Sequence, residues 1–247
     1  HEETLKKIAF YMDVLDNNYL PFPLKDCIQT TSPKNMKKAM SDIFLLHDYF
    51  IGRTLNFSRE NAKAILNSGN FSQSLSPSEK MKIVFACKGL SMTDCFWIRD
   101  EKDTCTWKDV DLRRNRLTDV SYEIAILGKN ISVTADKLRP DLSTVGMYPK
   151  YWKRETDGIY MWKTDKTRNF VNTKAELQVS DILDTTNVEH VKYREEQRDD
   201  KIFAVSKCIA NEEVSYIAAQ QIIDWCNHTE QNFNVYYYFS YKEIFQI

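Results

Sequence analysis

A hairpin signal within residues 148–163 constrains the fold of this chain more than any other local feature. The segments "YPKYWKR" (148–154) and "IYMWK" (159–163) are rich in aromatic residues and have the length of strands. Between them lies a short turn that ends in Asp157-Gly158, a dipeptide typical of tight turns between antiparallel strands. The sequence therefore predicts that the two segments pair as a hairpin.

A helix and a second hairpin follow this first one. Residues 172–186 are predicted to be helical, with Asn172 or Thr173 as the N-cap. Residues 188–195 and 201–209 are strand-like, and a charged turn joins them. The resulting order of strand, strand, helix, strand and strand predicts an α+β fold.

The segment 32–89 predicts three short helices. Ser32 and Ser76 are each followed by proline, the pattern of an N-cap and a first helical position, and Ser58 is a third N-cap candidate. Gly69 and Gly89 stand where the second and third helices would end. This punctuation indicates a small helical module.

The boundary between two domains is predicted near residues 139 and 140. Residues 1–139 would form the helical N-terminal module with extended connecting segments, including a strand-like stretch at 91–98 and a loop at 106–112. Residues 140–247 would form the second domain. That domain would close with a helix over 211–228 and an aromatic-rich tail.

Composition excludes several classes of protein. The net charge of −1 argues against a nucleic-acid binder that works through bulk charge. No apolar run reaches the roughly 18–20 residues of a membrane span, and the N-terminus lacks the apolar core of a secretory signal. The six cysteines form no Cys-x-x-Cys pair, so we expect free thiols in a reducing cytoplasm and no metal centre.

Lys163, at the end of the second predicted strand, is the residue that most suggests chemistry. Side chains alternate along a strand, so Lys163 shares a face with Ile159 and Met161. An ammonium group on an inward face needs an anionic partner, and Glu176 on the next helix can supply one. A lysine held in this way could contact a nucleotide phosphate. The alternative is a solvated surface pair, which would contribute little to stability.

The segment 141–152 is the candidate phosphate-covering loop. It contains Gly146, preceded by Ser143 and Thr144, and their backbone amides and hydroxyl groups could donate to phosphate oxygens.

Four segments of the chain resemble, in the same order, a group of bacterial proteins of the Firmicutes type that are related to HipA-like serine/threonine kinases. These segments are 89–98, 106–112, 140–152 and 175–193, and the helical stretch 40–66 is similar to the module that precedes the kinase lobe in that group. The resemblance covers roughly residues 35–220. It implies that a kinase-like N-terminal lobe follows the helical module.

The resemblance also implies roles for individual residues. Lys163 matches the nucleotide-phosphate lysine, and Glu176 matches its helix partner. Residues 206–214 match the hinge that meets adenine. The residues that match the phosphate-covering loop are Ser143, Thr144, Gly146 and Lys150.

The sequence departs from the family at the catalytic lobe. HipA-like kinases carry an Asp-Arg-His and Asn catalytic loop followed by a metal-binding Asp, and neither has a counterpart here. We therefore expect a nucleotide-binding half with ATP and Mg²⁺ as cofactors and with no catalytic or metal-ligating residue of its own. It would need a C-terminal lobe or a protein partner for phosphoryl transfer. The alternative is a non-catalytic interaction scaffold, phage-borne or defence-associated, that retains the kinase-like lobe.

Overall fold

The computed structural model describes residues 20, 21, 24, 44, 46–74, 76–114, 117–218 and 222. The chain divides into two compact units, one made of His1–Tyr49 with Tyr216–Ile247 and the other of Phe50–Ser215. The second unit contains nearly all of the described residues.

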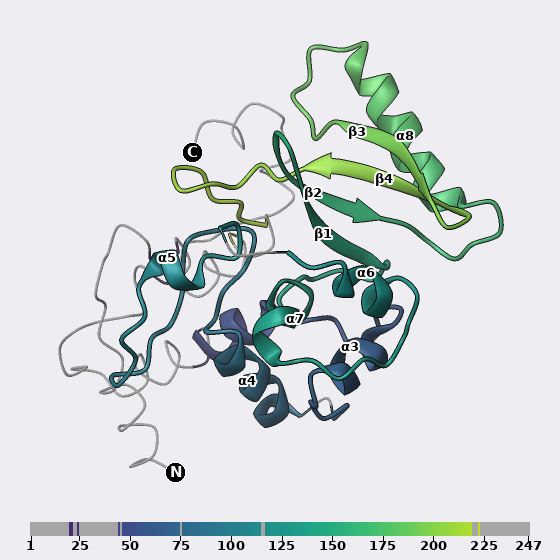
Figure 1. The fold of residues 1–247 in the computed structure, drawn as a ribbon. Coiled ribbons are helices and arrows are strands. Elements are labelled where there is room, and N and C mark those ends of the chain that lie inside the picture. The colour runs from purple at the N-terminus through teal and green to yellow at the C-terminus, as the bar shows by residue number, and fades with distance from the viewer. Residues whose placement is uncertain are drawn as a thin grey trace. The chain divides into compact units, whose positions relative to one another are not determined.

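A four-stranded antiparallel sheet in the order β1-β2-β4-β3 organises this unit (Figure 1). Its strands are β1 (Lys150–Glu155), β2 (Gly158–Lys163), β3 (Tyr193–Arg198) and β4 (Lys201–Lys207). Helix α8 (Val171–Asp184) connects β2 to β3 and packs against β3 and β4. The chain is therefore a mixed α+β protein, and the predicted order of strand, strand, helix, strand and strand is present.

Tight turns close both hairpins, although β3 spans Tyr193–Arg198 and so lies later in the chain than the 188–195 that the sequence predicts. In the first, Glu155 pairs with Gly158 across a two-residue turn. In the second, Asp199 and Asp200 both have positive φ angles, 48° and 58°. Two consecutive residues with positive φ are characteristic of the type I′ turn, whose twist matches that of the strands it joins.

The helical segment that precedes the sheet is made of short helices, of which α6 and α7 pack against β1. Ser76 caps α4 by accepting a hydrogen bond from the Glu79 amide at 3.3 Å, with Pro77 at the first helical position, and Gly69 ends α3, as predicted. The helices are α3 (Ala62–Ser68), α4 (Pro77–Ala86), α5 (Trp107–Val110), α6 (Val120–Ala125) and α7 (Ala135–Leu142).

Several local predictions are wrong. Residues 106–112 contain the short helix α5 instead of a loop, because Thr106 and Asp109 form a capping box. Residues 91–98 form no strand, and residues 211–218 are not helical. Helix α3 begins after Asn61 and not after Ser58. The helix expected at 32–50 and the aromatic tail lie largely or wholly outside the described residues.

One apolar core joins the helical segment to the sheet. Four fully or largely buried rings meet in it: Tyr122 of α6, Tyr151 of β1, Trp162 of β2 and Phe203 of β4. The centroids of Tyr122 and Tyr151 are 5.4 Å apart, and those of Trp162 and Phe203 are 5.5 Å apart. Aromatic pairs at such distances add stability beyond the area they bury. The boundary predicted near residue 140 falls inside α7 and inside this compact unit.

Replacement of Phe203 by alanine should destabilise the unit by about 3–5 kcal/mol, the usual cost of emptying a buried aromatic site. Because the core joins α6 to the sheet, the urea midpoints measured by tryptophan fluorescence and by far-UV circular dichroism should decrease by the same amount. Val188→Ala, at a side chain that is 57% exposed, should change stability by less than about 0.5 kcal/mol. Two separate transitions in the Phe203→Ala variant would contradict a shared core.

Candidate functional site

The predicted pair of Lys163 and Glu176 is formed in the structure. The Lys163 Nζ donates to Glu176 Oε1 in a close charged hydrogen bond between the end of β2 and the second turn of α8. The side chains are 19% and 29% exposed, so the pair is partly desolvated and differs from a fully solvated surface pair. The second oxygen, Glu176 Oε2, is buried and has no hydrogen-bond partner among the described residues.

Asp165, in the connection between β2 and α8, fixes the start of the helix. Its Oδ1 accepts from the Thr167 amide at 2.8 Å, and its Oδ2 accepts from the amide and the hydroxyl group of Thr173 at 2.7 and 2.8 Å. Thr173 is the third residue of α8, and its N–H would otherwise lack a partner. This explains why the helix starts at Val171 without Asn172 or Thr173 as its N-cap, which corrects the sequence-based assignment.

Lys150 stands directly opposite Lys163 in the pairing of β1 with β2. Opposite residues of an antiparallel pair project from the same face of the sheet, and like charges at such positions repel each other. The Lys150 Nζ donates to the Val145 carbonyl at 2.9 Å. Burial, together with the charges of Arg59 and Lys163, lowers the pKa of Lys150 to about 7, against the opposing effect of Glu176.

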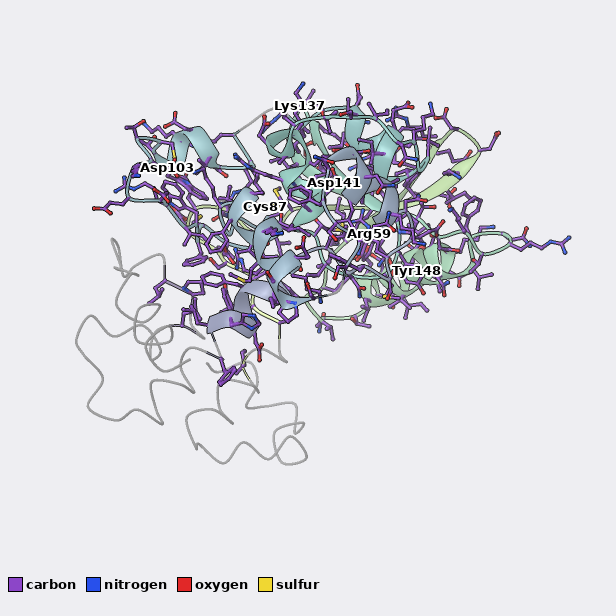
Figure 2. The ribbon with its side chains drawn as sticks, turned by 90° about the horizontal axis from the view of Figure 1, so that it is seen from below. Arg59, Cys87, Asp103, Lys137, Asp141 and Tyr148 are labelled. Atoms are coloured by element: carbon purple, nitrogen blue, oxygen red, sulfur yellow. The ribbon has the colours of Figure 1, made fainter. Side chains whose placement is uncertain are left out.

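Arg59, in the turn before α3, is a site residue that the sequence did not single out. It is 2% exposed, and its Nη2 donates to the backbone carbonyl of Lys150. Burial lowers the pKa of Arg59 to about 10, and the charge of Asp141 counteracts the shift. Arg59 and Asp141 are both labelled in Figure 2. A single arginine in a turn belongs to no repeating sequence pattern, so only the folded structure shows its hydrogen bond to the Lys150 carbonyl.

Gly146 allows the loop 143–149 to curve over the Lys150 side chain. Its φ angle is +102°, in a region that residues with a Cβ rarely adopt. A Cβ at this position would also overlap the Nζ of Lys150. The positive φ angle therefore favours glycine at this position of the candidate phosphate-covering loop, and a side chain here would displace the flexible end of Lys150.

The hydroxyl groups of Ser143 and Thr144 are engaged within the protein. Ser143 Oγ donates to the Arg139 carbonyl at 2.7 Å. Thr144 Oγ1 donates to the Pro140 carbonyl and accepts from Trp152 Nε1, the latter at 2.9 Å. These contacts close the C-terminal end of α7, and each hydroxyl proton is used in a hydrogen bond within the protein.

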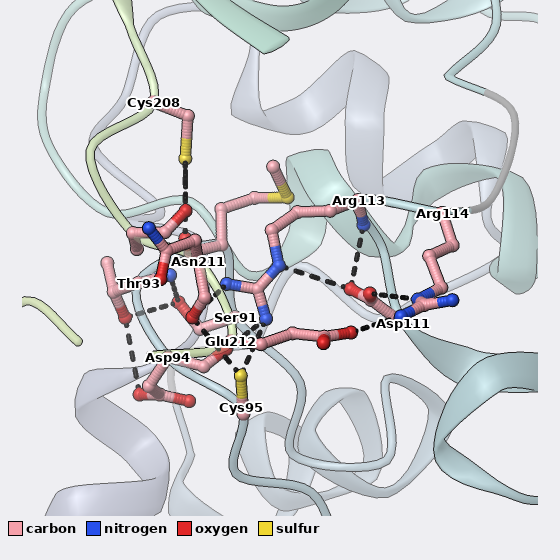
Figure 3. A network of polar contacts seen from close by, with 12 residues as sticks. Ser91, Thr93, Asp94, Cys95, Asp111, Arg113, Arg114, Cys208, Asn211 and Glu212 are labelled. Carbon is pink, nitrogen blue, oxygen red and sulfur yellow. Dashed lines mark hydrogen bonds and ion pairs between the residues drawn. The ribbon is translucent and has the colours of Figure 1, made fainter. Parts of the chain in front are cut away.

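The segment after β4, predicted to be the hinge, is held by a network of polar contacts (Figure 3). The Asn211 carbonyl accepts from Arg113 Nη1 at 3.2 Å and from Cys95 Sγ at 3.3 Å, and Arg114 pairs with Glu212. Arg113 is in turn bound by Asp111, with 3.2 Å between Nε and Oδ1. The network ties residues 208–212 to the segment 91–114, and it occupies the Asn211 carbonyl.

The cysteines of the described part, Cys87, Cys95, Cys105 and Cys208, are free thiols. Within the same part of the chain, no group of three His, Cys, Asp or Glu side chains is arranged to hold a metal ion. None of the helices described has the length and apolar character needed to cross a membrane.

Comparison of the chain with protein-family models, with curated proteins and with solved structures yields no match. A function for this chain is therefore inferred from the geometry of the site.

Replacement of Asp165 by asparagine should destabilise the protein by about 2–3 kcal/mol at pH 7, because hydrogen bonds to a charged acceptor are lost at the start of α8. Burial raises the pKa of Asp165, but the hydrogen bonds of Thr167 and Thr173 outweigh burial and the net shift is downward. A lowered pKa stabilises the fold above the unfolded-state value of about 3.9, and this contribution is lost as the pH falls through the folded value.

The stability deficit of Asp165→Asn, measured by urea denaturation, should accordingly be constant from pH 7 to about pH 5 and shrink below about pH 4. Asp181→Asn, at an exposed position of the same helix, serves as the control and should differ little from the wild type. A deficit that does not change with pH would show that the Asp165 charge is not what stabilises the helix start.

Proposed function

We propose that this chain binds a nucleoside triphosphate as the nucleotide-binding half of a HipA-like serine/threonine kinase. Lys163 would contact the phosphates, Glu176 would orient Lys163, and Lys150 with the loop 143–149 would cover the phosphates. This arrangement agrees with the lysine–glutamate pair that protein kinases use to hold ATP.

The observation that carries the proposal is an excess of positive charge at a partly desolvated site. Lys150 and Lys163 lie opposite each other, and Arg59 adds a third cation. The carboxylates that act on these groups are Glu176 and Asp141. When Lys150 is protonated, three cations face two carboxylates, which leaves one positive charge without a partner, and buried or half-buried charges are costly unless paired. A polyanion such as a triphosphate would supply the missing charge.

Mg²⁺ belongs to the proposal as the ion carried by the triphosphate. Mg²⁺ is commonly bound through substrate phosphates with few protein ligands. Since the described residues hold no cluster suited to a metal, the nucleotide and a C-terminal lobe would supply its ligands. A cytoplasmic location, where ATP is abundant, forms part of the same proposal.

Phosphoryl transfer would require groups from outside this chain. A kinase needs a residue that orients the nucleophile and residues that hold the metal ions. We therefore propose that a separate C-terminal lobe or a protein partner completes the enzyme.

A second candidate function is the non-catalytic interaction scaffold. The observation that favours it is the outer face of α8, where Val171, Val179 and Ile182 are 59%, 54% and 63% exposed. Their spacing places them within one face of the helix, whereas Thr173, Leu177 and Ser180 are buried on the other. An exposed apolar stripe of this kind is typical of a surface that binds another protein through apolar contacts.

Thermal unfolding of the full chain with ATP and Mg²⁺ tests the first function. Ligand at about 100 times its Kd would add about 2.7 kcal/mol of stability and raise Tm by several degrees. Lys163→Met should abolish this shift because it removes the ammonium group that meets the phosphates. Lys137→Met, at an exposed position of α7, should retain it.

Adenosine without phosphates should stabilise the protein much less than ATP if the phosphates carry the binding. Equal shifts for the wild type and Lys163→Met would contradict the assignment of Lys163. No shift in the wild type would favour the scaffold over the nucleotide-binding half.

A further inference from the structure

Arg59 connects the helical segment to the first residue of the sheet. It lies in the turn before α3, and its side chain reaches the carbonyl of Lys150, where β1 begins. A donated hydrogen bond from a guanidinium group that is 2% exposed has few competing water molecules, so it holds the backbone of Lys150 in place.

The guanidinium group of Arg59 is not saturated with acceptors. Its Nε and Nη1 have no hydrogen-bond partner among the described residues. The carboxylate whose charge acts on it, Asp141, is bound by Ser121 Oγ at 2.6 Å, and burial raises the pKa of Asp141. The positive charge of Arg59 is therefore incompletely neutralised, and in a buried environment such a charge acts strongly on its neighbours.

Four groups face the Lys150 side chain. Arg59 acts on it from the turn before α3, Lys163 from β2 and Glu176 from α8, and the Val145 carbonyl accepts its hydrogen bond. Arg59 is the first of the charges that oppose protonation of Lys150, after burial itself.

We propose that Arg59 is a positioning residue that sets both the place and the charge state of Lys150 at the phosphate site. The proposal rests on the proposed function for the role of Lys150 toward phosphate. The influence of Arg59 on Lys150 is a property of the ligand-free protein and can be measured without nucleotide.

A consequence is that nucleotide binding takes up a proton near neutral pH. The Lys150 amine, with a pKa of about 7, is partly neutral in the free protein. A phosphate at contact distance favours the charged ammonium and raises the pKa. Stabilisation by ATP should therefore be greatest below pH 7 and weaken as the pH rises above it.

Competitive labelling of lysines with trace acetic anhydride from pH 5 to pH 10, read by peptide mass spectrometry, measures the ionisation midpoint of Lys150 in the full chain. The wild-type midpoint should lie near 7. Arg59→Gln should raise the Lys150 midpoint by about one pH unit, since a neighbouring charge is removed. Arg59→Lys keeps the charge and should leave the midpoint close to that of the wild type.

Arg139→Gln is the matched control. Arg139 also donates to a backbone carbonyl, that of Ala86 at 3.2 Å, but its charge is not among those that act on Lys150. The Lys150 midpoint should not move in this variant. An unchanged midpoint in Arg59→Gln, or an equal change in Arg139→Gln, would overturn the proposal.

Arg59→Met, with an uncharged side chain of similar length, keeps the test decisive if Arg59→Gln does not fold. It removes the same neighbouring charge, so the Lys150 midpoint should rise in this variant as well. An unchanged midpoint would count against Arg59.

The pH dependence of stabilisation by ATP distinguishes failure of the role of Arg59 from failure of nucleotide binding. In Arg59→Gln, stabilisation by ATP should persist to a pH about one unit higher than in the wild type. If ATP does not stabilise the wild type at any pH, the proposed function is wrong. A higher Lys150 midpoint in Arg59→Gln would still support the effect of Arg59 on Lys150 in that case. If ATP stabilises the wild type but the Lys150 midpoint is unchanged in Arg59→Gln, Arg59 is not a positioning residue for Lys150, and the proposed nucleotide binding is unaffected.

Discussion

The register of the β1–β2 hairpin places two lysines opposite each other, and the rest of the site is arranged around this constraint. Lys150 and Lys163 project from the same face of the sheet, where their charges repel. Glu176 binds one ammonium group, and the Val145 carbonyl accepts a hydrogen bond from the other. The compensation is incomplete, because Arg59 brings a further positive charge to the start of β1.

Two structural devices hold these groups in register. Asp165 fixes the first turn of α8 through Thr167 and Thr173, and this sets the position of Glu176 relative to β2. The ring cluster around Phe203 joins the sheet to α6. The residues of the candidate site therefore lie between parts of the chain that are far apart in sequence but share one core.

The sequence predicted the elements that depend on local signals. Both hairpins, the intervening helix, the cap at Ser76 and the pairing of Lys163 with Glu176 are present. The prediction for α8 failed because a side chain from outside the helix decides where it starts, whereas the prediction of a loop at 106–112 overlooked a local capping box. Asp165 begins α8 from a distance of eight residues, although its carboxylate next to Thr167 was a detectable turn signal. Arg59 had no detectable signal, because its partner is 91 residues away.

By itself, the sequence indicated the two hairpins, the helix between them and Glu176 as a partner for Lys163, since alternation, turn residues and caps act over a few positions. Only the tertiary structure decided that Lys150 faces Lys163, that the hydroxyl groups of Ser143 and Thr144 are used within the protein, and that Arg59 lies beneath β1. These facts depend on packing and on the burial of charge. Both arise from contacts between distant segments, which no local pattern encodes.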